Sequence, residues 1–440
     1  MNKEIVNHNL VKEDISQEEC FSIDKKYFSK IINLAQDFAE IEYRPNRQML
    51  VTGFPRARFY FIKTKNIIFN FSQGELKILA KNLDNSDVIF PLHQKSNRKD
   101  SFSVDGRMIE RVLKNLPSGE IKVGFIEREE KDSPHVIHDY LQIKNKKFTA
   151  DFRAKPHVLN DENLVLPEKE GSFTINSADF LNASQKVILS GYEEKDFYKN
   201  PDRIRFGLRF QIEENQLTLT TTDGYRLSQK KIEAKGDSGK NDTFLVPKHT
   251  VLNLMKFLER DKKKNYPLKV VVDDVQKKVF FSHPDFRMRT PLINTKYPEI
   301  GPILEQEIRT KIKIEKGELF QALKKASSID SSKYNLVTIS IDCRNDHISV
   351  REENLDSRFK GRSFVETWAF EIDSKQSIET IYLNRKFVLD FIRSIKSRIL
   401  SIEIADPSKP ILFKPSGYEF IAPHYDDRDY IHMIMPIKIH

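Results

Sequence analysis

Few residues of this chain have the types and spacing that metal binding requires. His135 and His138 lie three residues apart, but no further ligand cluster accompanies them, so we interpret them as part of a surface loop. A second stretch of candidate ligands near the C-terminus is interpreted as a solvated loop rather than a cation site. It comprises His424, Asp426, Asp427 and Asp429. We therefore predict no metal centre.

Motifs for nucleophilic catalysis and for phosphate binding are also missing from the sequence. Neither Cys20 nor Cys343 has a neighbouring histidine that could activate its thiol, and two cysteines are too few for a disulfide framework. The 15 glycines form no loop of the kind that cradles phosphates. We predict a protein that is not an enzyme and needs no cofactor, and the low cysteine content favours a reducing cytoplasm.

Basic side chains are the remaining candidate functional groups, and they concentrate on two predicted helices. Segment 254–264 contains five basic residues against Glu259 and Asp261, and segment 385–398 contains five against Asp390. One such helix alone is typical of an ordinary solvated face. Several equivalent basic helices on one surface would instead contact a phosphate backbone without reading base sequence. The net charge of +9 is compatible with such a polyanionic partner.

Three segments, starting at residues 21, 173 and 312, share one pattern and indicate a repeated α+β domain. Each has alternating apolar residues typical of a strand, then a polar residue, then a helix. Asp24 and Asn176 are good N-caps for these helices, and Glu315 is a poorer one. A second helix and a strand follow in each repeat. The helices are predicted at 107–116, 248–258 and 386–395, and the strands at 121–125, 268–272 and 400–404.

The 440 residues can accommodate three such domains. We predict a polar tail at 1–18, domain 1 at 19–170 with a linker over 151–171, domain 2 at 171–305, and domain 3 at 306–440. A second linker is predicted near 301–309, and insertions are predicted near 90–100 and 127–139. No run of about 18 apolar residues predicts a membrane-spanning helix, and the N-terminus resembles neither a signal nor a transit peptide.

Segment 221–228, Thr-Thr-Asp-Gly-Tyr-Arg-Leu-Ser, closely resembles the Thr-Asp-Gly-His-Arg-Leu-Ala signature of bacterial sliding clamps, the beta subunit of DNA polymerase III. Further matches follow in the family's order. Segment 292–299 resembles the end of the second domain, segments 387–392 and 402–411 resemble the last helix and strands, and segment 433–439 resembles the C-terminal ending. Arg44-Pro45 resembles the turn after the first helix. The resemblance covers residues 20–439.

The resemblance implies a head-to-tail homodimer whose six similar domains close into a ring around duplex DNA. Helices would line the hole and antiparallel sheets would form the outer wall. Such a clamp would tether the replicative polymerase by enclosure, with weak and uniform phosphate contacts that permit sliding. It would act in the bacterial cytoplasm at the nucleoid.

The DNA-contacting residues come from two sources. The resemblance implies Arg44, whose alternative role is an ion pair within the turn, together with Lys199 and Arg203. Helix-face reasoning adds four more residues, which are Lys26, Arg111, Lys256 and Arg393.

The resemblance also implies a pocket between domains 2 and 3 that receives short apolar peptides of polymerases, the clamp loader and repair proteins. Its wall would comprise Thr222, Gly224, Tyr225, Arg226, Leu227, Pro298, Ile303, Pro410, Met433, Met435 and Pro436. Methionines adapt to several partner sequences, although Met433 and Met435 could also be plain strand core. Tyr225 replaces the usual histidine, and Arg205 stands where the family has an aliphatic residue.

An alternative function is that of a clamp-like paralogue that serves as a partner-binding scaffold outside chromosomal replication. The two hypotheses differ in what they require of the basic helices. A scaffold that never encircles DNA has no need of a basic inner face.

Overall fold

The computed structural model of the chain describes residues 20–39, 42–45, 61–72, 74–82, 86–130, 133–158, 172–191, 207–236, 242–259, 265–295, 297–329, 335–354, 361–374, 376, 378–417 and 427–438. It divides into two compact units. Unit 1 comprises Met1–Leu166 with Ser282–Arg289, and unit 2 comprises Pro167–Phe281 with Thr290–His440. Each unit is described by itself.

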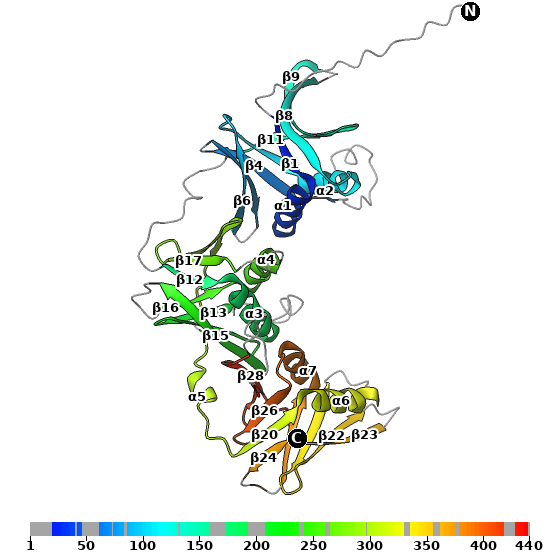
Figure 1. Cartoon of the computed structure of the whole chain (residues 1–440), viewed down its shortest axis with the longest axis vertical. Helices are drawn as coiled ribbons and strands as arrows, with labels where there is room; N and C mark the ends of the chain where they lie inside the picture. Colours follow the sequence, from blue (N-terminus) through cyan, green and yellow to red (C-terminus); the bar gives the residue numbers. More distant parts are fainter. Residues whose placement is uncertain are drawn as a thin grey trace, which may run out of the picture. The chain divides into compact units, whose positions relative to one another are not determined.

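The described residues of unit 1 form two helices packed on antiparallel strands (Figure 1). One sheet has the order β1-β8-β9-β10, and a second is built from the pairs β11–β7, β7–β4, β4–β5 and β5–β6. The elements are β1 (Cys20–Asp24), α1 (Lys25–Phe38), β2 (Glu42–Pro45), β3 (Phe61–Thr64), β4 (Asn66–Ser72), β5 (Glu75–Lys81), β6 (Asp87–Lys95), β7 (Ser101–Asp105), α2 (Gly106–Asn115), β8 (Glu120–Glu130), β9 (Ser133–Asn145), β10 (Phe148–Arg153) and β11 (Lys155–Pro156).

The first part of unit 2 contains the second of the three repeats. Its elements are β12 (Ser172–Asn176), α3 (Ser177–Val187), η4 (Ile188–Ser190), β13 (Leu208–Glu213), β14 (Gln216–Thr222), β15 (Arg226–Gly236), β16 (Asp242–Val246), α4 (Lys248–Glu259), β17 (Pro267–Asp273), β18 (Lys278–His283) and β19 (Phe286–Pro291). The last residues of β18 and most of β19 group with unit 1, where β19 pairs with β6.

The rest of unit 2 contains the third repeat. Its elements are α5 (Gly301–Leu304), β20 (Thr310–Glu315), α6 (Lys316–Ala326), η7 (Ser327–Ile329), β21 (Leu336–Asp342), β22 (His347–Asn354), β23 (Gly361–Trp368), β24 (Glu371–Ser374), β25 (Ile378–Asn384), α7 (Arg385–Ser394), β26 (Ile399–Ile404), β27 (Ile411–Ser416) and β28 (Tyr430–Ile434). Strand pairs run without interruption through β16-β13-β14-β15-β28-β27-β26-β20-β24, and a separate sheet has the order β23-β22-β21-β25.

The predicted repeat is confirmed in the strand pairing. In each copy the strand before the first helix pairs antiparallel with the strand after the second helix. These pairs are β1 with β8, β12 with β17, and β20 with β26. The division into three domains with the boundaries given above stays a prediction, because contacts group the second and third repeats into one unit.

The predicted caps begin the first helices as expected. Asp24 accepts a hydrogen bond from the Tyr27 backbone N–H at 2.8 Å, and Asn176 accepts from two backbone N–H groups of α3. Glu315 makes no such side-chain bond, which agrees with its poorer capping ability. These local hydrogen bonds satisfy backbone donors that a helix start leaves unpaired.

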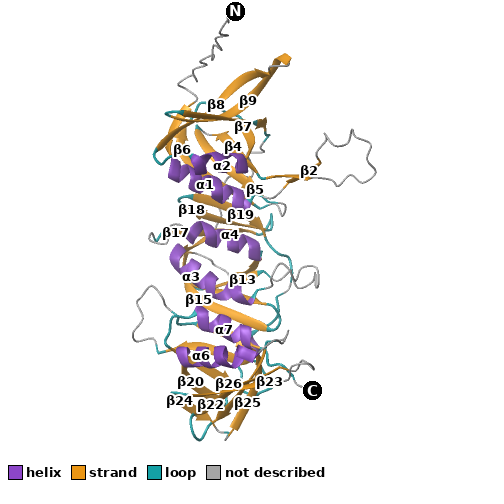
Figure 2. Cartoon of the chain, turned by 90° about the vertical axis from the view of Figure 1, so that its right-hand side faces the viewer, coloured by secondary structure: helices purple, strands orange, loops and turns teal. Residues whose placement is uncertain are grey.

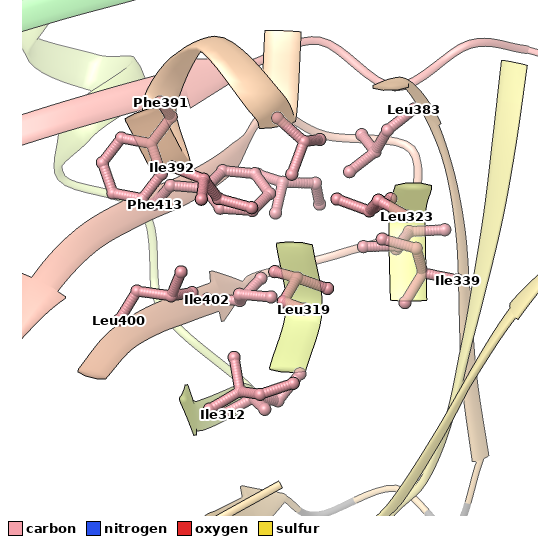
Figure 3. Close-up of a cluster of buried hydrophobic side chains, with 14 of the residues drawn as sticks. Ile312, Leu319, Leu323, Ile339, Leu383, Phe391, Ile392, Leu400, Ile402 and Phe413 are labelled. Carbon is pink, nitrogen blue, oxygen red and sulfur yellow. The ribbon is translucent and has the colours of Figure 1, made fainter. Parts of the chain in front are cut away.

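A large apolar core lies in the third repeat (Figure 3). Leu319 and Leu323 of α6 and Phe391 of α7 are fully buried against side chains from the strands. Ile312 of β20 and Ile339 of β21 belong to the same cluster, so it joins the two sheets. Apolar burial of this kind is the main favourable term in folding.

One predicted linker is partly wrong. Residues 151–156 belong to β10 and β11 rather than to a connection, and β11 pairs with β7 through Lys155 and Pro156. The second predicted linker, 301–309, contains the short helix α5. Charged and proline residues suggested the first linker, whereas backbone pairing decides the structure there.

Candidate protein-binding site and basic helices

A tight turn joins β14 to β15 and carries the segment that resembles the clamp signature. The Asp223 carboxylate accepts hydrogen bonds from the backbone N–H groups of Tyr225 and Arg226, at 3.0 and 2.9 Å. Thr222 donates its hydroxyl proton to the Arg226 carbonyl at 2.7 Å. Gly224 has a φ of +84°, a left-handed conformation that glycine adopts without strain.

The turn is joined to the C-terminal strand. β15 pairs antiparallel with β28, which places Leu227 opposite Met433. Just beyond this pair, the Met435 backbone N–H donates to the Tyr225 carbonyl at 2.8 Å. The side chains of Tyr225 and Met435 are 54% and 37% exposed, so both are accessible to a partner.

An apolar cluster covers the sheet face next to this turn, and we call it the outer apolar cluster. Four members are buried and five are half-buried. The buried members are Leu227, Ile300, Leu412 and Met433, and the half-buried members are Tyr297, Ile303, Leu304, Ile308 and Ile431. The half-buried members offer apolar surface that a partner side chain could cover.

The structure brings three predicted wall residues together in this cluster: Leu227, Ile303 and Met433. Pro298 is exposed and follows the cluster residue Tyr297, and the Pro410 carbonyl accepts a hydrogen bond from Gln306 at 2.8 Å. Pro436 is half-buried next to Met435. The assignment of these residues to a peptide pocket stays a prediction.

Arg226 has a position unlike the other predicted wall residues, because its side chain is only 5% exposed. Its guanidinium forms ion pairs with Asp223 at 3.0 Å and with Asp390 of α7 at 2.7 Å. It also lies 4.2 Å from the Phe387 ring centroid. Arg226 thereby fastens the turn to α7, a structural role that the sequence did not indicate.

Sequence reasoning missed several members of the outer apolar cluster. They are Tyr297, Ile300, Leu304, Ile308, Leu412 and Ile431. The signal that could have found part of this set was the spacing of Ile300, Ile303, Leu304 and Ile308, which is typical of an apolar stripe. That segment was interpreted as a linker instead.

A buried polar network lies on the opposite face of the same sheet. The Ser228 hydroxyl is 2.7 Å from the Ser190 hydroxyl and 2.7 Å from Nδ1 of His432, which stacks on Phe391. Burial, assisted by the positive charge of Arg226, lowers the pKa of His432 to about 3. Burial also raises the pKa of Tyr430 to about 12. Both groups are therefore neutral near pH 7.

The prediction that 424–429 forms a solvated loop is wrong for Asp427. Its side chain is fully buried and forms an ion pair with Lys186 of α3. Asp427 also accepts hydrogen bonds from the backbone N–H groups of Lys396 and Ser397, at 2.8 and 2.9 Å. Long-range pairing therefore buries a residue whose local sequence is highly polar. His424 and Asp426 lie outside the described residues.

The four residues predicted from helix faces are all exposed. Lys26 and Arg111 lie on α1 and α2 of unit 1, and Lys256 and Arg393 lie on α4 and α7 of unit 2. Within unit 2 the helices α4, α3, α7 and α6 follow one another along one side of the sheets (Figure 2). Arg44 lies in β2, where only the backbone is described, and Lys199, Arg203 and Arg205 lie outside the described residues.

The interpretation of His135 and His138 as part of a surface loop is wrong, because both residues lie in strand β9. His138 lies 2.7 Å from the Arg153 guanidinium, and the side chain of His135 is not described. Among the described residues no group of three histidine, cysteine or acidic side chains could hold a metal ion. In that same part of the chain, no helix is long and apolar enough to cross a membrane.

Comparisons with known proteins find the same family that segment 221–228 resembles. Residues 198–299 match the family model "DNA polymerase III beta subunit, central domain". The beta sliding clamp of Staphylococcus aureus is 20% identical over 386 residues, which cover 86% of this chain and 89% of the relative. The beta sliding clamp of Mycoplasma capricolum is 24% identical over 264 residues, which cover 58% of this chain and 64% of the relative.

Solved structures resemble the whole chain. The DNA polymerase III beta subunit of Thermotoga maritima superposes with a TM-score of 0.72 at 17% identity, over 96% of this chain and 100% of that chain. The sliding clamp of Pseudomonas aeruginosa bound to griselimycin gives a TM-score of 0.73 at 15% identity, with the same coverage. The protein therefore has the sliding-clamp fold, an α+β architecture of helices on antiparallel sheets, as predicted.

The family model and the curated proteins point to the same kind of protein. The chain is similar in sequence to bacterial beta sliding clamps, and residues 198–299 are similar to the central domain of the beta subunit of DNA polymerase III. The prediction that it is not an enzyme agrees with this relationship.

Proposed function

We propose that this protein is a DNA sliding clamp, a homodimer that encircles duplex DNA and tethers the replicative polymerase without catalysing a reaction. The observation that carries the proposal is the clamp fold over 96% of the chain, with exposed basic residues on its helices. Uniform phosphate contacts by such residues retain DNA without choosing a base sequence. The proposed location is the bacterial cytoplasm.

Two edge strands, one in each unit, support the proposed dimer. β10 lies at one end of its sheet in unit 1, and β23 lies at one end of its sheet in unit 2. The terminal strands present backbone donors and acceptors that a second strand can pair. Phe148 of β10 and Phe364 of β23 are 43% and 52% exposed. We infer that β10 of one copy pairs with β23 of the other.

Partner proteins are proposed to bind at the outer apolar cluster, through short apolar peptides of the polymerase, the clamp loader and other clamp-binding proteins. The exposed Tyr225 and Met435 side chains and the half-buried Ile303 support this site. A shallow site for a few side chains gives affinities of about micromolar, which allows partners to exchange. The Met435→Ala/Pro436→Ala variant should weaken peptide binding and leave dimerisation intact.

Retention on circular and linear DNA tests the proposal that the protein encircles duplex DNA. The protein loaded on circular DNA should remain bound and should be lost when that DNA is linearised, because enclosure and not tight binding retains it. Its solution mass should be near twice 51.6 kDa, and Phe364→Asp should shift it toward a single chain. Equal retention on circular and linear DNA, or a strict monomer at micromolar concentration, would contradict the proposal.

A further inference from the structure

One row of side chains crosses the sheet beside the outer apolar cluster. Directly opposed residues on neighbouring strands share a face of the sheet. Arg209 of β13 is opposite Thr220 of β14, Thr220 is opposite Gln229 of β15, and Gln229 is opposite Ile431 of β28. Because Ile431 belongs to the outer apolar cluster, this row runs from the cluster to a cationic side chain.

Arg209 is held at the edge of the cluster by an aromatic contact. Its guanidinium carbon lies 5.5 Å from the ring centroid of Tyr297, which packs against the cluster. The two residues of the row between Arg209 and Ile431 are buried, since Thr220 and Gln229 are 1% and 8% exposed. Their side chains hydrogen-bond to each other at 3.3 Å. Arg209 itself remains half-buried.

The charge of Arg209 is not neutralised within the part of the chain that the structure describes. No described carboxylate forms an ion pair with it, and its buried Nε has no hydrogen-bond partner there. A guanidinium stays charged at every physiological pH and presents a planar set of donors that matches a carboxylate. A half-buried cation of this kind is stabilised when an anion binds.

We propose that Arg209 is a specificity-determining residue of the peptide site. It binds the carboxylate of an aspartate or glutamate in a partner segment whose neighbouring apolar side chains cover the outer apolar cluster. This inference rests on the proposed function, because it assumes that a peptide binds there. It adds that the peptide is acidic as well as apolar, and that the acidic residue lies on the β13 side of the cluster.

Two fluorescent peptides of the same apolar sequence, one with aspartate and one with asparagine next to the apolar residues, test this proposal on the full chain. The wild type should bind the aspartate peptide about tenfold more tightly, which is the value of one charge-assisted hydrogen-bonded pair. Arg209→Gln should bind both peptides with the affinity of the asparagine peptide. Lys269→Gln removes an exposed charge on β17 and should leave the preference unchanged.

Each outcome has a distinct meaning. Equal binding of both peptides by the wild type overturns the role of Arg209 but leaves the peptide site in place. An equal loss of both affinities in Arg209→Gln, with unchanged thermal unfolding, also overturns it, because the residue would then act structurally. If Arg209→Gln does not fold, the wild-type preference decides the question, and Arg209→Lys should retain part of it. Failure of the wild type to bind either peptide contradicts the proposed site itself.

Discussion

Removal of the Asp427 carboxylate should destabilise the protein severely. Its side chain is fully buried, and the Lys186 partner is 4% exposed. Asp427→Ala removes the carboxylate that pairs with the buried Lys186 ammonium, which lies 5.6 Å from the ring centroid of Tyr430. It also removes the acceptor for the Lys396 and Ser397 backbone N–H groups. Breaking a buried ion pair from one side costs about 3–5 kcal/mol, and we expect the free energy of unfolding to fall by that amount.

The assay is urea denaturation of the full chain followed by tryptophan fluorescence. Trp368 of β23 is the single tryptophan of the chain, so the signal reports on unit 2. The matched control is Glu371→Ala, which breaks the exposed pair of Lys313 and Glu371 at 2.7 Å. That variant should lose less than about 1 kcal/mol, because water already solvates both charges.

A double-mutant cycle completes the test. The double variant Lys186→Met/Asp427→Asn should lose less free energy of unfolding than the sum of the losses in the two single variants, because neither position then carries a charge. If Asp427→Ala costs no more than Glu371→Ala, water reaches the pair and the argument from burial is refuted.

Three further predictions concern pH, backbone strain and DNA. The pKa of His432 is about 3 in the folded chain and about 6.5 when the chain is unfolded, so the unfolded chain binds the additional proton. The free energy of unfolding should therefore fall as the pH drops from about 6.5 toward 3. His432→Phe should flatten this dependence in acid-unfolding curves, and an unchanged profile would show that His432 is not its source. Gly224→Ala should cost about 1–2 kcal/mol in thermal unfolding, since a Cβ is strained at a φ of +84°, whereas no cost would mean that the turn relaxes. Lys256→Gln and Arg393→Gln should each reduce the slope of log affinity against log salt concentration for duplex DNA by about 1. Lys269→Gln, which changes an exposed lysine of strand β17, is the control and should leave the slope unchanged. Equal slopes in all variants would mean that Lys256 and Arg393 do not contact DNA.

Local sequence patterns determined much of the fold. The capping residues Asp24 and Asn176 begin their helices as predicted, and the buried face of α1 contains Phe28, Ile31, Ile32 and Ala35 at helical spacing. Asn215 lies in the turn between the paired strands β13 and β14, and Asn345-Asp346 lies in the turn between β21 and β22. Caps, helical periodicity and tight turns depend on residues a few positions apart, so the chain encodes them locally.

The candidate site was predictable only where it coincides with a sequence motif. Segment 221–228 and the C-terminal strand were found, and the structure pairs Leu227 with Met433. The segment that completes the outer apolar cluster, 297–308, contributes through its packing on strands distant in sequence. A local pattern does not reveal which surface a short apolar stripe will cover.

The sequence alone determined the repeated strand–cap–helix plan, because short-range periodicity and capping specify each element. Only the tertiary structure decided that Asp427 is buried, that Arg226 fastens the turn to α7, and that Arg209 lies beside Tyr297. These outcomes depend on contacts between residues far apart in the chain, with separations of 241 positions for Lys186 and Asp427 and 164 positions for Arg226 and Asp390. Burial and charge neutralisation are properties of such long-range contacts, and no short stretch of the chain contains them.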